Sequence, residues 1–115
     1  MVTRELEKRP DPAYALVRVV ELARNGIDHV QYVGRVLQDA NNLGYAPHDL
    51  CQCLATLRTE DFHHAERYPN DRYWRDVYLL PSFVSPGGHR DNLYLKFMLK
   101  QSCLVVVLCS FHRDR

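Results

Sequence analysis

The chain has 115 residues, of which 46% are hydrophobic and 25% charged, and its formal net charge is +1. This size and composition suit an apolar core, so we expect one domain over residues 1–115, with residues 1–11 as a loose arm. No apolar run approaches the roughly 20 residues that span a bilayer, and the charged start lacks the apolar segment of a signal peptide, so we expect a cytoplasmic protein without membrane contact.

The charges are distributed unevenly along the chain. Residues 1–61 carry seven lysines and arginines against nine acidic residues, whereas residues 62–115 carry eight against five and hold four of the six histidines. A binding site for a polyanion is therefore expected in the second half. The excess is small, which favours contact with a few phosphates over a long nucleic-acid track.

The first half of the chain has the pattern of helices. Asp11-Pro12 suits an N-cap followed by proline in the first turn, and Asn25-Gly26 suits a helix end. Apolar residues recur at helical spacing in this half. The predicted elements are a helix over 12–24, a short edge strand over 27–32, and helices over 33–42 and 47–57.

The second half has the pattern of strands, because β-branched and aromatic residues alternate with turn formers. Short turns pair consecutive strands antiparallel. Around Phe97, leucines alternate with Tyr94, Lys96 and Met98, so one face of the sheet should pack on the helices and the other should be more open. The predicted fold class is α+β, with N-terminal helices on one face of an antiparallel sheet. The predicted strands cover 62–68, 73–83, 92–99 and 103–113.

The four cysteines do not have the spacing of a zinc ribbon. We expect Cys51, Cys53, Cys103 and Cys109 to be buried free thiols, the last two on the final strand. A metal site using His48, Cys51 and the paired histidines of the second half is the alternative. The chain contains neither an HExxH motif nor a CxxC pair, so we expect no metal and no cofactor.

Several polar side chains of the second half suit RNA cleavage. A ribonuclease without a metal uses the RNA's 2′-hydroxyl as nucleophile and needs a base, an acid and a cation for the phosphorane-like transition state. Histidine serves for either proton transfer near neutral pH, and arginine serves as the cation. The chain has His63-His64 at the head of the sheet region, His112 at its end, and Arg75 and Tyr94 between them.

Each of these residues also has a plainer interpretation. Paired or terminal histidines are often only solvated, and Tyr94 suits any amphipathic strand. Arg75 can pair with Asp76 or Glu66, and Lys96 can be an ordinary surface lysine. Only their combination indicates RNA chemistry.

Over roughly residues 12–113 the chain resembles the MqsR toxins, the motility quorum-sensing regulator family of mRNA interferases. The helix end at Asn25-Gly26 and the segment from Ala40 to Gly44 agree in kind with the family. The most specific motifs are the W-x-D-V-Y run and the Y-L-K that follows it. The matching runs are Asp61-Phe62, Tyr68, Trp74-Arg75-Asp76-Val77-Tyr78, Tyr94-Leu95-Lys96, Val105-Val106-Val107 and Ser110-Phe111.

The resemblance implies a RelE-like α+β fold and cleavage of mRNA without the ribosome, at GCU-type triplets. It also implies a cognate MqsA-like antitoxin encoded nearby. That partner typically has a zinc-binding half that masks the toxin and a helix-turn-helix half that binds DNA.

The resemblance also implies site residues. The family's catalytic tyrosine falls on Tyr94, and the lysine two positions after the Asp-Phe pair corresponds to His64. The glutamine after the tryptophan corresponds to Arg75, and the lysine after the terminal Ser-Phe corresponds to His112. We expect the two histidines to share the proton transfers, the arginine to hold the phosphate and the tyrosine to orient it. Which histidine is the base stays open.

Three of these four identities differ from the family's, which has two interpretations. One is drift toward reduced activity. We favour the other, that the replacements are competent, because histidine works nearer neutral pH than lysine, whose ordinary pKa is about 10.4. We also expect His63, Lys96 and Arg113 to bind the substrate. The alternatives to a nuclease are an RNA-binding domain that does not cut and an antitoxin-dependent transcriptional co-regulatory module.

Overall fold

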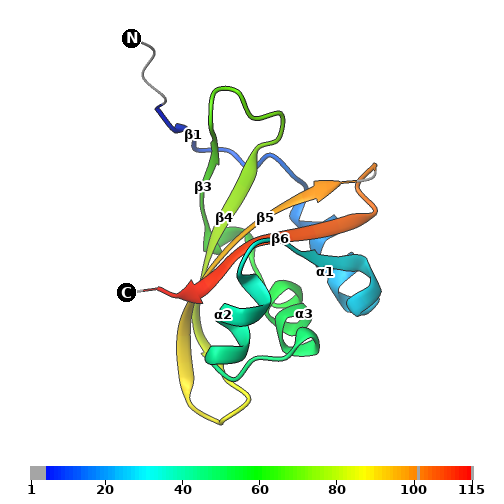
Figure 1. Ribbon diagram of the computed structural model, residues 1–115, viewed down its shortest axis with the longest axis vertical. Coiled ribbons are helices and arrows are strands. Elements are labelled where there is room, and N and C mark those ends of the chain that lie inside the picture. Colours follow the sequence, from blue (N-terminus) through cyan, green and yellow to red (C-terminus); the bar gives the residue numbers. More distant parts are fainter. Residues whose placement is uncertain (1–4, 101, 115) are drawn as a thin grey trace.

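Three α-helices pack on one face of a six-stranded sheet within residues 5–100 and 102–114, which the computed structural model describes (Figure 1). Two short 3-10 helices, Ile27–His29 and Thr59–Asp61, lead into strands. The α-helices are α1 (Leu16–Arg24), α2 (Val36–Asn42) and α3 (Pro47–Ala55).

The sheet has the order β1-β3-β4-β5-β6-β2. Neighbouring strands run antiparallel, except that the edge strand β2 runs parallel to β6. Long neighbouring strands joined by short connections form the centre of the sheet. The strands are β1 (Glu7–Arg9), β2 (Val30–Tyr32), β3 (Phe62–Arg67), β4 (Arg75–Val84), β5 (Arg90–Lys100) and β6 (Val105–Arg113).

The core lies between the sheet and the helices. The alternation predicted for β5 is confirmed, because Leu93, Leu95, Phe97 and Leu99 are buried in one cluster with residues of all three helices. Phe97 stacks on Tyr78 of the neighbouring strand, with ring centroids 5.3 Å apart. The opposite face carries the polar residues that alternate with this set and a small second buried cluster of Met98, Val105 and Val107.

The first helix begins later than predicted, at Leu16 instead of residue 12. The reason is tertiary: the buried carboxylate of Asp76 accepts hydrogen bonds from the backbone N–H groups of Ala13 and Tyr14, at 2.8 and 3.0 Å. The two N–H groups that would lie in the first turn of the predicted helix are therefore bonded to a residue of β4. Burial raises the pKa of Asp76, and these two N–H groups oppose that rise.

Part of the expected loose arm is a strand. Residues 1–4 of the segment 1–11 lie outside the described residues, but β1 pairs antiparallel with β3. The guanidinium groups of Arg9 and Arg67 each lie over the ring of Trp74, 4.6 Å from its centroid. Arg67 also pairs with Glu7 at 2.9 Å. These contacts attach β1, a charged segment without an apolar face, to the rest of the sheet.

Three register shifts alter the side-chain alternation of the sheet, and one of them lies between β4 and β5, from Leu80 to Phe83. In β3 the register with β4 shifts between Phe62 and His64. In β6 the register with β5 shifts so that Lys96 pairs with Ser110 whereas Phe97 pairs with Leu108. A bulge adds one residue to one strand and re-aims the side chains beside it.

The prediction of four buried thiols is wrong for Cys103. Ser102 and Cys103 both have positive φ, at 58° and 63°, so they form the turn before β6, and Cys103 is exposed. Cys51 and Cys53 are buried in α3, and Cys109 is half-buried on β6.

The predicted fold class is confirmed. Helices on one side of a mostly antiparallel sheet form a RelE-like α+β fold. In the ranges that the structure describes, every helix is too short or too polar to cross a bilayer.

Candidate functional site

The sheet face opposite the core brings together most of the predicted site residues. His64 pairs with Val77, which pairs with Lys96, so these residues form one row across β3, β4 and β5. Tyr94 pairs with His112 in the next row. Arg75 lies on the same face, two residues before Val77.

The bulge in β3 places two consecutive histidines on this face. Nδ1 of His63 lies 2.6 Å from Nδ1 of His64, and the ring centroids are 4.9 Å apart. In an unbroken strand the two side chains would point to opposite faces. His63 is exposed, whereas His64 is half-buried.

Glu66 links His64 to Lys96 across the face. One carboxylate oxygen lies 2.8 Å from Nε2 of His64, and the other accepts a hydrogen bond from Nζ of Lys96 at 3.3 Å. Burial alone would raise the pKa of Glu66, but its bonds to these two partners lower the pKa below the ordinary value. The carboxylate therefore stays ionised and holds both neighbours.

Arg75 is held by an acidic neighbour. Its guanidinium donates to the carboxylate of Asp71 four residues earlier, instead of pairing with Asp76 or Glu66 as considered from the sequence. Burial acts to lower the pKa of Arg75, but Asp71 outweighs it and raises the pKa above the ordinary value. Arg75, Glu66 and Lys96 line a hollow of about 290 Å³ on this face. Arg67 and Asp71 also line it, so a phosphate group there would meet three cations and two carboxylates.

Tyr94 lies flat against His112 at the other side of the face. Their rings stack with centroids 4.4 Å apart and an interplanar angle of 11°. Burial raises the pKa of Tyr94 to about 12, with Glu66 and Asp114 adding to the rise. Its hydroxyl therefore remains protonated, and able to donate a hydrogen bond, throughout the physiological pH range.

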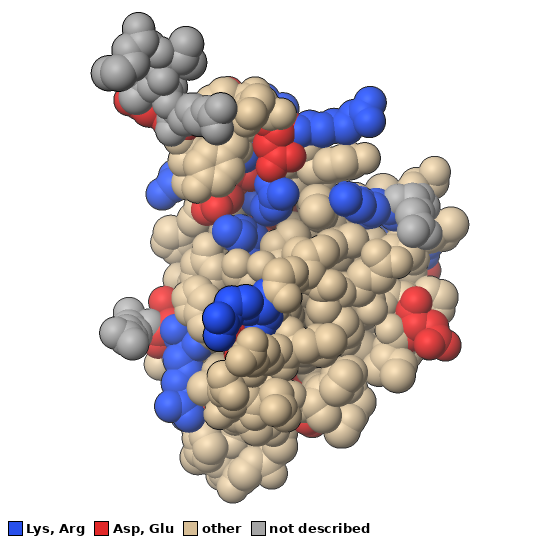
Figure 2. Space-filling model, in the orientation of Figure 1, with Lys and Arg blue, Asp and Glu red and all other residues tan. Residues whose placement is uncertain are grey.

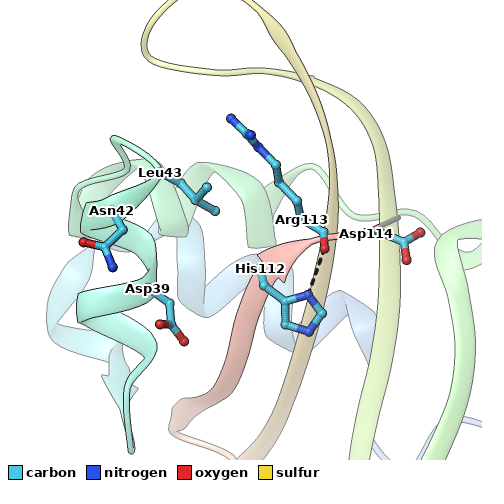
Figure 3. Close-up of a pocket in the computed structure, with 6 residues that line it drawn as sticks. All are labelled: Asp39, Asn42, Leu43, His112, Arg113 and Asp114. Carbon is cyan, nitrogen blue, oxygen red and sulfur yellow. Dashed lines mark hydrogen bonds between the residues drawn. The ribbon is translucent and has the colours of Figure 1, made fainter.

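The orientation of His112 is set by its own backbone. Nδ1 lies 2.9 Å from the carbonyl oxygen of Arg113, as drawn in Figure 3. A carbonyl oxygen only accepts, so Nδ1 carries the hydrogen, and in the neutral ring the lone pair is on Nε2. His112 also lines a hollow of about 900 Å³, between the end of β6 and α2, with Asp39, Asn42 and Leu43.

The structure does not bring Arg113 to the polar face. Figure 3 shows its side chain leaving β6 in a different direction from that of His112. Its Nε lies 3.3 Å from the buried carboxylate of Asp91, which also accepts a hydrogen bond from the hydroxyl of Tyr45 at 2.7 Å. Arg113 does line the larger hollow beside His112.

The face therefore has two halves. His64 with Glu66 lies on β3, and Tyr94 with His112 lies on β5 and β6. Strands β4 and β5 separate the backbones of His64 and His112, by roughly 14 Å at the usual spacing of about 4.8 Å per strand. Lys96 lies on β5, between the two halves.

Sequence reasoning missed the roles of Glu66 and Asp71. Period-two alternation places Glu66 on the face of His64, and Asp71 lies in the turn just before Arg75, so both signals were present. Neither signal identifies the bonded partner, because side-chain pairing across strands depends on register.

Charge on the surface is mixed. In Figure 2 the lysines and arginines of the visible face lie in separate groups, several beside acidic side chains, without merging into one basic field. This agrees with the small charge excess and suits a short contact with phosphates. In the part of the chain that the structure describes, no three His, Cys, Asp or Glu side chains gather as metal ligands would.

Comparison with known proteins identifies the family. A search of the curated proteins finds no match. The family model described as "Motility quorum-sensing regulator, toxin of MqsA" matches residues 11–113. The match includes β3 to β6 and every predicted site residue. The chain therefore belongs to this family, the toxins of toxin–antitoxin systems whose antitoxin partner is MqsA.

Proposed function

We propose that the chain is an mRNA endoribonuclease that cuts without a metal, using the RNA's 2′-hydroxyl as nucleophile. The observation that carries this proposal is the Tyr94–His112 pair. A neutral phenol lies against an imidazole whose Nε2 is available, and both side chains lie at positions that correspond to active residues of the family's motif.

His112 is the base. Its Nδ1 hydrogen is donated to the carbonyl of Arg113, so Nε2 of the neutral ring accepts the proton of the 2′-hydroxyl. The 2′-oxygen then attacks the phosphorus.

The scissile phosphate lies over β5. There the hydroxyl of Tyr94 donates to a phosphate oxygen and orients it, while Arg75 and Lys96 offset the negative charge of the transition state. Arg113 binds a flanking nucleotide from the hollow beside α2. Arg75 must exchange its Asp71 partner for phosphate oxygen, which the same planar fork of donors allows.

The acid is on the side of His64. As the bond between phosphorus and the 5′-oxygen breaks, this half of the site supplies one proton to that oxygen. The products are a 2′,3′-cyclic phosphate and a free 5′-hydroxyl. One proton is taken by His112 and one is released from the histidine pair, so the reaction is balanced.

The family supports the remaining parts of the proposal. The substrate is mRNA, cut in the cytoplasm at GCU-type triplets without the ribosome. The partner is an MqsA-like, DNA-binding antitoxin encoded nearby, which restrains the toxin.

The test uses His64→Ala, His112→Ala and Tyr94→Ala, with His48→Ala as the matched control, because His48 is exposed at the start of α3. Purified proteins are incubated with GCU-containing RNA, and growth arrest is measured on expression. We expect each site variant to lose cleavage and toxicity while the control keeps both. Undiminished activity in all three site variants removes the site.

A second candidate is an RNA-binding module that does not cut. It is favoured by the ion pair of Arg75 with Asp71 and by the bond of His64 to Glu66, which leave both side chains occupied in the RNA-free chain. Such a module, or a co-regulator acting through the antitoxin, would bind RNA or antitoxin but leave no 2′,3′-cyclic phosphate end. Chemical analysis of the RNA ends distinguishes binding from cleavage.

A further inference from the structure

His63 and His64 lie within hydrogen-bond distance of each other. Their Nδ1 atoms are 2.6 Å apart, and such a contact is favourable when one ring nitrogen donates and the other accepts. The two rings therefore act as one unit, in which a proton on either Nδ1 is available to the other.

His64 has no ring nitrogen left for RNA. Its Nδ1 contacts His63, its Nε2 contacts Glu66 at 2.8 Å, and its side chain is only 15% exposed. His63 is exposed, and within the described residues no hydrogen bond is recorded for its Nε2. Of the two histidines, only His63 presents a free nitrogen to a substrate.

The bulge shifts the backbone position of His63 along β3. His64 pairs with Val77 and Phe62 pairs with Tyr78, so His63 is the extra residue between these two pairs. Tyr94 pairs with Leu79, the next residue of β4 after Tyr78. His63 is therefore nearer than His64 to the row that contains His112.

We propose that Glu66, His64 and His63 form a proton relay, in which Glu66 and His64 are positioning residues and His63 is the catalytic acid that protonates the leaving 5′-oxygen. The proposal rests on the proposed endoribonuclease function and deepens it. It assigns the acid role to His63, whereas the sequence reasoning divided the proton transfers between His64 and His112 without deciding which is the acid.

Charged groups from three strands surround the relay. Glu66 of β3 faces His64 directly, its other oxygen is held by Lys96 of β5, and Arg75 of β4 is paired with Asp71. Each of these two cations is thus bound to a carboxylate, and Glu66 holds the ring of His64 in place.

The proposed transfer moves one proton along the two rings. In the loaded relay, His64 carries hydrogens on both nitrogens and His63 carries one on Nε2. The Nε2 proton of His63 passes to the 5′-oxygen while the Nδ1 proton of His64 passes to Nδ1 of His63. Both rings end neutral, and His64 still donates Nε2–H to Glu66. A proton from water reloads the pair.

The decisive test compares two RNA substrates, one natural and one with sulfur in place of the bridging 5′-oxygen at the bond that the wild-type protein cuts. A thiolate leaves without protonation, so loss of the acid matters little for the second substrate. We expect His63→Ala to cut natural RNA about 10²- to 10⁴-fold more slowly, and the sulfur substrate within about tenfold of wild type. His112→Ala, which lacks the base, should lose activity on both.

Three results would overturn the relay. In the first, His63→Ala cuts natural RNA at the wild-type rate. In the second, His63→Ala loses the same activity on both substrates. In the third, the sulfur substrate restores the activity of His64→Ala but not that of His63→Ala. If wild-type protein cuts neither substrate, the proposed function itself fails. His48→Ala should behave as wild type throughout.

Glu66→Gln tests the positioning role separately. Loss of the carboxylate should move the alkaline limb of the pH–rate profile to lower pH, and Glu66→Asp should restore part of the change; a merely structural role would lower the rate at every pH alike.

Nitrogen-15 NMR of the imidazoles adds a readout without RNA. The signals of His63 and His64 should both change in Glu66→Gln, whereas those of His112 should not. A change confined to His64 would show that the two rings are not coupled.

Discussion

The phenol ring of Tyr94 lies flat on the imidazole of His112, at 4.4 Å between centroids. The two side chains are a directly opposed pair on β5 and β6, which explains the close contact. The stack holds the imidazole in place from one side, and the bond from Nδ1 to the carbonyl of Arg113 fixes its tautomer. The imidazole of His112 is therefore held in one orientation by these two contacts.

Tyr94→Phe separates stacking from hydrogen bonding. The phenyl ring keeps the contact with His112, but a donor to the phosphate is lost, so we expect the rate of cleavage to fall about 10²-fold with little change in stability. Tyr94→Ala removes both and should be slower still. Single-turnover kinetics measure the difference. Equal rates for Tyr94→Phe and wild type would mean that the hydroxyl has no role in the reaction.

Asp71→Asn should free the guanidinium of Arg75. In the RNA-free protein the two side chains are paired, so removal of the negative charge should lower KM for RNA several-fold, with kcat nearly unchanged. Arg75→Ala should weaken RNA binding and reduce the slope of log affinity against log salt by about 1. Steady-state rates give KM and kcat, and fluorescence titrations at several salt concentrations give the affinity and its salt slope. A higher KM for Asp71→Asn would show that Asp71 positions Arg75 instead of competing for it.

Glu66 should make stability depend on pH in the acid range. Its pKa in the folded protein lies below the ordinary value of 4.5, so the folded state prefers the ionised form. This contribution is present above pH 4.5 and is lost as the pH falls through the lowered value. Glu66→Gln should therefore lower the free energy of unfolding by about 1–3 kcal/mol at pH 7 and by less at pH 3. Urea unfolding at the two pH values measures this, and an equal loss at both would contradict the assignment.

Asp76 should be structural. Asp76→Ala leaves the N–H groups of Ala13 and Tyr14 without their acceptor, and we expect it to lower the free energy of unfolding by about 2–4 kcal/mol. Asp76→Asn retains one acceptor oxygen and should lose less. The chemical denaturation midpoint reports both changes. A small loss for Asp76→Ala would mean that solvent readily replaces the carboxylate at these groups.

The elements that were predictable are those whose signal is local. Alternation around Phe97 identified the core face of β5, and the helical spacing before Asn42 identified α2. The start of α1 was misplaced because the carboxylate that binds its first turn comes from Asp76, more than 60 residues away. The strand Glu7–Arg9 has no apolar alternation, and its attachment depends on Trp74.

The candidate site was predictable in its residue types and not in its connections. Strand parity places His64 and Tyr94 on one face, but parity also predicts that His63 points away from it. The bulge that reverses this leaves no mark in the sequence. The partners Glu66 and Asp71 likewise follow from register and turn geometry, which no single side chain reveals.

The pairing of the two imidazoles depends on the number of residues between Phe62 and Ala65, because His63 is an extra residue in β3. A relative one residue shorter between Phe62 and Ala65 would keep a histidine opposite Val77 and still lose the second ring from this surface. An in-frame deletion of a single codon would therefore break the pair as effectively as a substitution. Variation in the spacing of this segment among related toxins is accordingly as informative as the identity of its residues.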